Sequence, residues 1–364
     1  MSTLAITGLG MVCTVGHDAA TACAALRCGL TRPTTPDFEV PSDEELGNVP
    51  LTGHPLVGIS EGFQGLGLYL RLATHALTDL LHDAGLQGGD TEMWRNAALY
   101  VGLSPTRDED IDFYDDILQE RIAEELLMHA GIAIPVTRGV ARLRGHASAL
   151  WALREATTAL ERGEAERALV VGVDSLLESN VLEVLYGAGR LKYEGHARGL
   201  SPGEAAAAFL VEPVALARRR KVAPRCRIER IEVAREPSVL LTGERPTGAG
   251  LARVVSQALG NTRPGVLYGD LNGEEWRSLE WGNALMRLRE AGHDLTGVPQ
   301  HWPATSLGDT GAASGAISVL AAANALARGH VPVGGALVWS RSDTEEVAAV
   351  YLHCEAPETS GRTA

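Results

Sequence analysis

The sequence lacks a long apolar segment. It contains no run of about 18 consecutive apolar residues, the length that a helix needs to span a bilayer. Its first residues, Met1 to Leu4, carry no basic charge and do not match the start of a secretory signal. We therefore expect a cytoplasmic protein with no membrane contact.

Cysteine is also scarce. The chain has five cysteines, an odd number, and none of them forms the CxxC pairs that are typical of zinc sites. Free thiols in a reducing compartment are the expected state. The sequence predicts neither a metal site nor a cofactor.

Basic residues are outnumbered by acidic ones. The chain has 32 Lys and Arg against 46 Asp and Glu, which gives a net charge of −14. Such a charge argues against nucleic acid as a partner. It also mildly disfavours docking to an acidic carrier protein, unless the surface holds a local basic patch. The one basic run, residues 218–221, is typical of a solvated helix end, where the helix dipole favours cations.

What the sequence does contain is an alternation of apolar strands and helices. The chain has 364 residues, of which 45% are hydrophobic, enough for a large buried core. Apolar strands at residues 97–103 and 168–173 flank a helix that we predict over 147–162. This pattern indicates an α/β fold with a mostly parallel sheet covered by helices on both faces. The alternation of strands and helices begins again after a charged stretch, so we divide the chain into two halves, 1–217 and 218–364.

Four glycine-containing motifs follow one another along the chain. They are ITGLGMV from Ile6, RGHASAL from Arg144, GLSPGEA from Gly199 and GDTGAASG from Gly308. In order and spacing they resemble the β-ketoacyl synthases of the thiolase-like superfamily over nearly the whole chain. The resemblance implies a thiolase-like, five-layered α-β-α-β-α fold built from two pseudo-symmetric halves.

The resemblance also implies a catalytic site, and this chain departs from the family at each of its positions. The family uses a cysteine at a helix N-terminus as nucleophile and two histidines that stabilise negative charge on the donor. The cysteine corresponds to His146, and the histidines correspond to Asp270 and Asp309. A family lysine falls on Ala304, and the glycine-rich turn near the C-terminus is replaced by SRSDTE at residues 340–345.

These substitutions reverse the charge of the expected site. Two carboxylates stand where an enolate and a malonyl carboxylate would bind, and like charges in contact cost several kcal/mol in a poorly solvated pocket. We therefore interpret the chain as a catalytically inactive protein that acts by binding. It would serve as a chain-length-factor-like subunit, or as an adaptor or chaperone of a secretion system.

An enzyme with new chemistry is the alternative. His146, Asp270 and Asp309 are expected to converge, because their family counterparts do. They could then work as a general base or bind a metal in an acyl-thioester hydrolase or transferase.

A second group of residues follows the first carboxylate motif and alternates aromatic and charged side chains. Trp276 and Glu280 are four apart, as are Arg277 and Trp281, so each pair shares one side of a helix. Two interpretations stay open: a binding face anchored by Trp and Arg, or a helix start capped by Asn272 with its tryptophans buried. The group consists of Asn272, Glu274, Trp276, Arg277, Glu280 and Trp281.

The resemblance also bears on partners. Proteins of this fold pair through a central strand near the active site, which implies a homodimer or a heterodimer with a ketosynthase-like paralogue. The D-x-N-G-E…E-W pattern from Asp270 resembles that of non-catalytic relatives beside bacterial secretion components. We therefore expect a protein partner: an effector, an adaptor or an acyl carrier protein.

Overall fold

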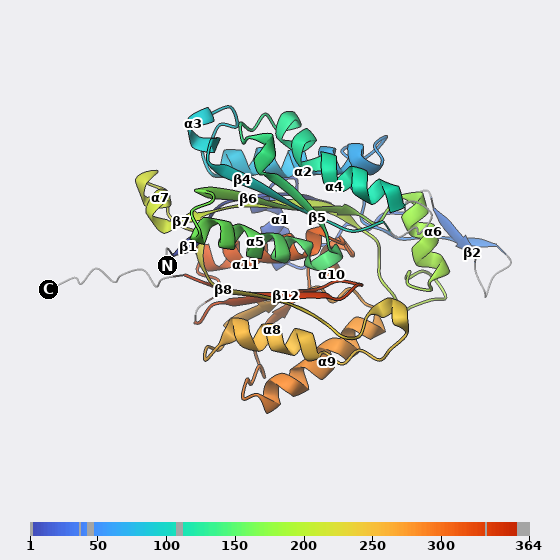
Figure 1. Ribbon diagram of the computed structural model, residues 1–364. Coiled ribbons are helices and arrows are strands. Elements are labelled where there is room, and N and C mark those ends of the chain that lie inside the picture. Colours follow the sequence, from blue (N-terminus) through green and yellow to red (C-terminus); the bar gives the residue numbers. More distant parts are fainter. Residues whose placement is uncertain (1–2, 36–37, 42–46, 107–111, 332, 355–364) are drawn as a thin grey trace.

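Figure 1 shows five layers, in which two layers of strands enclose a layer of helices and outer helices cover both faces. The expected thiolase-like α-β-α-β-α architecture is confirmed. The computed structural model describes residues 3–35, 38–41, 47–106, 112–331 and 333–354.

The strands form two layers that are joined at one place. The first layer holds β1 (Leu4–Cys13), β4 (Ala97–Leu103), β5 (Gly139–Leu143), β6 (Arg167–Ser175) and β7 (Glu204–Pro213). The second layer holds β8 (Cys226–Arg235), β9 (Val266–Tyr268), β10 (Gln300–His301), β11 (Ala336–Arg341) and β12 (Glu346–His353). The strand order is β10-β9-β11-β12-β8-β1-β7-β6-β4-β5, and a short β1–β8 pairing links the two layers.

The expectation of a mostly parallel sheet is wrong. Strands β4, β5 and β6 are parallel, as are β9, β10 and β11, but β7, β1, β8 and β12 pair antiparallel with their neighbours. Strands β11 and β12 are joined by a short turn, and such a connection allows only an antiparallel pair. The sequence pattern did not separate the two types because the antiparallel strands β1 and β7 are as buried and apolar as the parallel strands β4 and β6.

The central layer contains α5 and α11, which contact strands of both layers. Twelve of the fifteen residues of α11 are buried, and six of these twelve are alanine, so the strands approach the helix closely. Gly172 of β6 is part of this fit, because a Cβ there would lie 2.8 Å from the carbonyl oxygen of Ala312. The central helices are α1 (Ala19–Arg27), α5 (Ser148–Glu161), α10 (Ala304–Leu307) and α11 (Ala313–Ala327).

The outer helices bury one face each against the strands. On one side, α2 packs on β1 and β7 while α4 packs on β5, and on the other side α8 packs on β8 and β12. These outer helices are α2 (Gly65–Asp83), α3 (Thr91–Trp94), α4 (Asp112–His129), α8 (Ala249–Leu259) and α9 (Glu275–Glu290).

The remaining elements are short. The basic run at residues 218–221 follows the expectation, since α7 ends in it with Arg218 and Arg219 in its last turn. The division into 1–217 and 218–364 stays a prediction. The short elements are β2 (Glu39–Pro41), β3 (Asn48–Pro50), α6 (Ser179–Gly187), α7 (Val214–Arg219) and the 3-10 turns Val136–Arg138, Gly145–Ala147 and Leu240–Thr242.

The structure also bears on the expected lack of membrane-spanning helices and on the expected free thiols. Among the described residues, no helix is both long and apolar enough to cross a membrane. All five cysteines are free, and three of them, Cys13, Cys23 and Cys226, are buried.

Candidate functional site

His146 lies in the turn between β5 and α5, at the centre of the molecule. The turn begins at Gly145, whose positive φ of 57° is a conformation that favours glycine. Ser148 ties the turn to the end of β4, since its Oγ donates to the carbonyl oxygen of Leu103 at 2.6 Å. From the other strand layer, Ser340 Oγ lies 2.8 Å from the carbonyl oxygen of His146. Only 2% of His146 is exposed, so its imidazole faces inward.

The imidazole of His146 is paired with Asp309. Nε2 of His146 lies 2.7 Å from Oδ1 of Asp309, and that oxygen also accepts the Gly311 N–H at 2.8 Å. Oδ2 of Asp309 accepts from the amide of Asn272 at 2.6 Å. Both carboxylate oxygens are therefore occupied by the chain itself, and only 1% of the residue is exposed.

The charge of Asp309 is strongly stabilised. Burial alone raises the pKa of its carboxyl, but His146, Arg277 and the hydrogen bond from Asn272 lower it by more. The pKa of Asp309 consequently lies well below its usual range, and the group is a carboxylate at all ordinary pH values.

Arg277 of α9 is the centre of the charged contacts. Its Nη2 lies 3.2 Å from Nδ1 and 3.4 Å from Nε2 of His146, and it donates to Oδ1 of Asp343 at 2.7 Å. Its Nη1 donates to the carbonyl oxygen of Arg341 at 2.6 Å and lies 3.8 Å from Oδ1 of Asp270. Burial lowers the pKa of Arg277, but the surrounding carboxylates raise it above its usual value. One permanent cation, 2% exposed, therefore holds several carboxylates in place.

Arg190 closes the site from the loop after α6. Its guanidinium donates to Glu274 at 2.7 and 2.9 Å and to Asp343 at 2.8 and 3.2 Å, which are two bidentate pairs. Although burial raises the pKa of Asp343, Arg190 and Arg277 lower it well below its usual range. We call these connected residues the His146 cluster: His146, Arg190, Asn272, Glu274, Arg277, Asp309 and Asp343.

Asp270, the third predicted site residue, lies beside the His146 cluster and does not touch the imidazole. Its Oδ2 accepts from Ser340 Oγ at 2.6 Å and from the N–H of Arg341 at 2.8 Å. Its Oδ1 has no hydrogen-bond partner among the residues that the structure describes. Arg341 pairs in turn with Glu280 at 3.0 Å, and both side chains are 1% exposed. Ser340 therefore links Asp270 to the turn of His146, and the three predicted residues are near one another without forming one triad.

Metal binding by these residues is not supported by the geometry. Within the part of the chain that the structure describes, no group of three or more His, Cys, Asp or Glu side chains is placed to hold a metal ion. The oxygens of Asp309 already accept three hydrogen bonds from protein donors.

The aromatic and charged group after Asp270 points mainly into the protein. Helix α9 begins at Glu275 with Glu274 at its N-cap, so the expected cap at Asn272 is wrong. Asn272 Oδ1 instead accepts from the N–H of Glu274 at 3.1 Å. Trp281 is buried and stacks on Trp339 with ring centroids 4.7 Å apart. Glu274, Arg277 and Glu280 are buried as well, so they offer no outer face to a partner.

Trp276 and Ala304 differ from the buried group. Trp276 is half-buried, and the guanidiniums of Arg277 and Arg341 lie 5.3 and 5.0 Å from its ring centre. Ala304 is the first residue of α10, and its carbonyl oxygen accepts the N–H of Gly308 at 2.9 Å. Its methyl group supplies no charge to the site.

Three important residues were missed in the sequence: Arg190, Asp343 and Arg341. Asp343 and Arg341 belong to the segment at residues 340–345, where the sequence resemblance had led us to expect a glycine-rich turn. The charges of these two side chains were the feature of the sequence that could have identified them as site residues. Arg190 had none, because its carboxylate partners lie 84 and 153 residues further along the chain.

Three solved structures that share this fold contain ketosynthases. The oxazolomycin ketosynthase domain of Streptomyces albus matches with a TM-score of 0.78 and 16% identity, over 99% of this chain and 75% of that one. A type II polyketide synthase acyl-carrier protein in complex with its ketosynthase bound to the hexaketide gives 0.80 and 15%, over 98% and 100%. The ketosynthase from module 6 of the bacillaene synthase of Bacillus subtilis gives 0.74 and 14%, over 98% and 72%.

These matches define the class of protein by fold: the chain has the thiolase-like fold of ketosynthases. At 14–16% identity the likeness concerns the fold alone. No protein-family model matches the sequence, and no curated protein sequence does.

Proposed function

We propose that this chain is a ketosynthase-fold protein without condensing activity, which acts by binding a second protein chain. The observation that carries the proposal is the His146 cluster. At the position predicted for the nucleophile, a buried imidazole is held by Asp309 at 2.7 Å and by Arg277 at 3.2 Å. A site that works by acyl transfer needs a nucleophile with an open approach, and the side chain of His146 is only 2% exposed.

The electrostatics of the cluster support the same proposal. Condensation requires donors that face a developing negative charge. Here Arg190, Arg277 and Asn272 donate to carboxylates of the chain itself, and Arg277 also donates to the carbonyl oxygen of Arg341. The His146–Asp309 contact has the length of a general-base pair, but its burial leaves a substrate no access, so we do not favour the hydrolase or transferase alternative.

The edge strand β5 is the surface that we propose for the partner. It is the last strand in the order of the large sheet, and within the described residues it pairs with β4 only. An edge strand offers unpaired backbone groups to another chain. We propose that a second ketosynthase-fold chain continues the sheet there, either another copy or a paralogue, as a chain-length-factor-like subunit would require.

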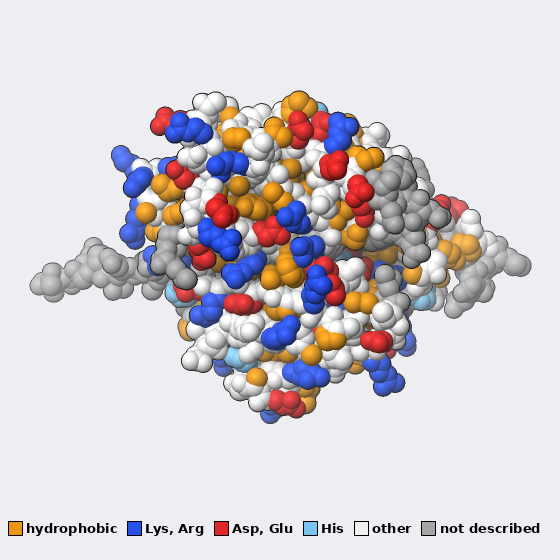
Figure 2. All heavy atoms as spheres, in the orientation of Figure 1, with side chains coloured by type: hydrophobic (Ala, Val, Ile, Leu, Met, Phe, Trp, Pro, Cys, Tyr) orange, Lys and Arg blue, Asp and Glu red, His pale blue; other side chains and the backbone are white. Residues whose placement is uncertain are grey.

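The surface beside β5 is charged with both signs. Figure 2 shows Lys and Arg side chains gathered among Asp and Glu side chains over the face where α5 lies in Figure 1. Arg142 pairs with Glu155 at 3.2 Å, and Arg144 lies over the ring of Trp151 at 4.2 Å. Such a surface suits a protein partner of mixed charge better than a purely acidic one.

The test combines molecular mass and activity on the full chain. We expect sedimentation to show a particle of two or more chains, either with this chain alone or after coexpression with a ketosynthase-fold paralogue. We also expect no turnover of acyl thioesters of coenzyme A or of an acyl carrier protein. Turnover that disappears in folded His146→Ala would contradict the proposal, and so would a chain that stays monomeric under both conditions.

A further inference from the structure

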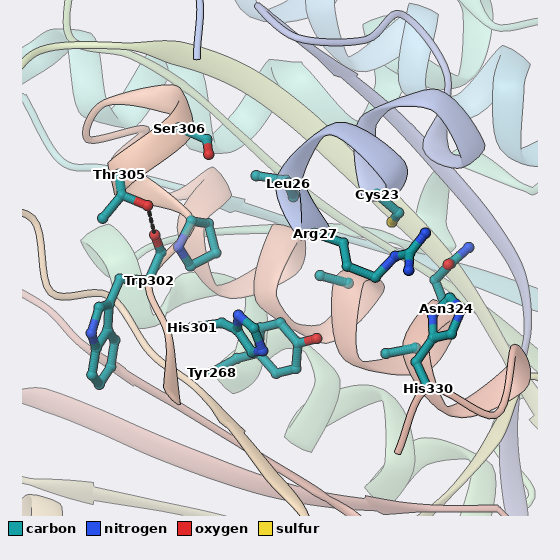
Figure 3. A pocket seen from close by; sticks show the side chains of 13 residues that line it. Cys23, Leu26, Arg27, Tyr268, His301, Trp302, Thr305, Ser306, Asn324 and His330 are labelled. Atoms are coloured by element: carbon teal, nitrogen blue, oxygen red, sulfur yellow. Dashed lines mark hydrogen bonds between the residues drawn. The ribbon is translucent and has the colours of Figure 1, made fainter. Parts of the chain in front are cut away.

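A small cavity lies away from the His146 cluster, between the C-terminal end of α1, the short helix α10 and the C-terminal part of α11. Its volume is about 70 Å³, and thirteen residues line it. Figure 3 shows Arg27 from α1 reaching toward Asn324 and His330, with the Tyr268–His301 pair below and Trp302 and Thr305 on the other side. We call it the Tyr268 pocket. None of its lining residues makes the charged contacts of the His146 cluster.

The lining has a positive character that stands out in this acidic chain. None of the thirteen lining residues is Asp or Glu, although the whole chain carries a net charge of −14. The lining does include the guanidinium of Arg27, which carries a full positive charge, and the imidazoles of His301 and His330. Burial lowers the pKa of His301, so this imidazole is a neutral hydrogen-bonding group near neutral pH. A cavity of this composition attracts an anion.

Four polar side chains of the pocket are free to bind a ligand. Tyr268 is 8% exposed and stacks on His301 with ring centroids 5.1 Å apart. Burial raises the pKa of Tyr268 to about 12, so its hydroxyl keeps its proton and can donate it. In the described part of the chain, the side chains of Arg27, Tyr268, Asn324 and His330 have no hydrogen-bond or ion-pair partner. This hydroxyl reaches solvent, and a ligand in the cavity would accept its hydrogen bond in place of water.

The helix dipoles disfavour an anion in the pocket, but their partial charges are smaller than the positive charges of the nearby arginines. Helices α1 and α11 both end at the pocket, and each C-terminus carries about half a negative charge. The full positive charge of Arg27, at the last position of α1, and that of Arg328, at the C-cap of α11, exceed the two partial charges. Cys23 adds no negative charge, because burial raises the pKa of its thiol to about 12.

We propose that the Tyr268 pocket binds the phosphate group of a small organic ligand. Phosphate carries nearly two negative charges and offers oxygens in several directions, which matches donors arriving from Arg27, Tyr268 and His330. A carboxylate has only two oxygens in one plane and would leave some of these donors unpaired. The apolar part of the lining, which includes Leu26, Ala321 and Ala325, is available to the organic part of the ligand. The proposal does not depend on the proposed function.

The test is calorimetric titration of the full chain with inorganic phosphate near neutral pH, with acetate at matched ionic strength as the second arm. We expect saturable binding of phosphate, and binding of acetate weaker by at least about tenfold. Arg27→Ala should weaken phosphate binding at least about tenfold, because a charge-assisted hydrogen bond is lost. Tyr268→Phe keeps the ring and its stacking and should weaken binding about fivefold.

Arg219→Ala is the matched control, because Arg219 is also an exposed arginine at the last position of a helix, α7. It should bind phosphate like the wild type. Equal binding of acetate and phosphate would overturn the assignment of the ligand class. The absence of saturable phosphate binding, or equal losses in Arg27→Ala and Arg219→Ala, would overturn the site itself.

Discussion

The His146 cluster and the Tyr268 pocket are neighbours in sequence and opposites in chemistry. Tyr268 precedes Asn272 of the cluster by four residues, and Ser306 of the pocket precedes Asp309 by three. In the cluster, carboxylates and guanidiniums pair with one another, while in the pocket Arg27, Tyr268, Asn324 and His330 have no partner among the described residues. The comparison teaches that buried polarity by itself does not mark a functional site. A group already paired within the chain serves the structure, and an unpaired one is available to a ligand.

The largest expected effect is a loss of stability when the central cation of the His146 cluster is removed. Arg277→Ala leaves Asp309 and Asp343 buried without their shared cation, so it should lower the free energy of unfolding by about 3–5 kcal/mol. Denaturant unfolding followed by circular dichroism measures this, and exposed Arg219→Ala should change it by less than about 0.5 kcal/mol. A loss as small as that of the control would mean that the cluster is not structural.

Asp343→Ala should have the next largest effect. It leaves Arg190 and Arg277 without their common carboxylate and should cost about 2 kcal/mol, less than Arg277→Ala because 19% of the Asp343 side chain is exposed. Added formate should restore part of the melting temperature of the variant, because it can enter the vacated position between the two guanidiniums. Formate should leave the wild type unchanged, and equal shifts in both proteins would contradict the internal pairing.

Acidification should weaken the cluster through Asp309. Its pKa in the folded protein lies below that of the unfolded chain, which is about 3.9. Between these values the unfolded state binds more protons, so this contribution to stability is complete above about pH 4 and falls as the pH falls. By pH 3 the wild type should have lost about 1 kcal/mol of its advantage over Asp309→Asn. Unfolding of both proteins at several pH values measures the difference, and a constant difference would count against the depressed pKa.

The smallest effect is expected in the pocket. Tyr268→Phe removes a hydroxyl that makes no hydrogen bond within the described residues, so the free energy of unfolding should change by less than about 0.5 kcal/mol. The same variant should bind phosphate more weakly. A large loss of stability in unfolding experiments without phosphate would show that the hydroxyl has a structural partner, and the contrast between the two regions would disappear.

Much of the fold could be predicted from the order of the motifs. The turn at Gly145 and the turn at Gly308 were expected to bring His146 and Asp309 together, and their side chains do touch. The antiparallel middle of the sheet was not predicted, because a buried apolar strand looks the same in either direction. Pairing partners are set by contacts between distant residues, and periodicity carries no information about those.

The candidate site shows the same limit at the level of single residues. Asp270 was expected to converge with His146, but its carboxylate accepts hydrogen bonds from Ser340 Oγ and from the N–H of Arg341. The Tyr268 pocket could not be predicted at all, because its lining comes from residues between 23 and 330 and contains no motif. Only the folded chain shows which polar groups remain without a partner.

The contacts of Arg190 have a consequence for how the chain reaches its folded state. During synthesis Arg190 is made long before Glu274 and Asp343, and the turn at His146 is made long before Ser340 and Ser342, whose hydroxyls hold it. The centre of the molecule therefore stays incomplete until nearly the entire chain is available. Such contacts between distant residues slow folding, because loop-closure entropy is lost before they form. A truncation that removes β11 and β12 would leave the first half with a charged, open interior, so this protein completes its fold at its last strands.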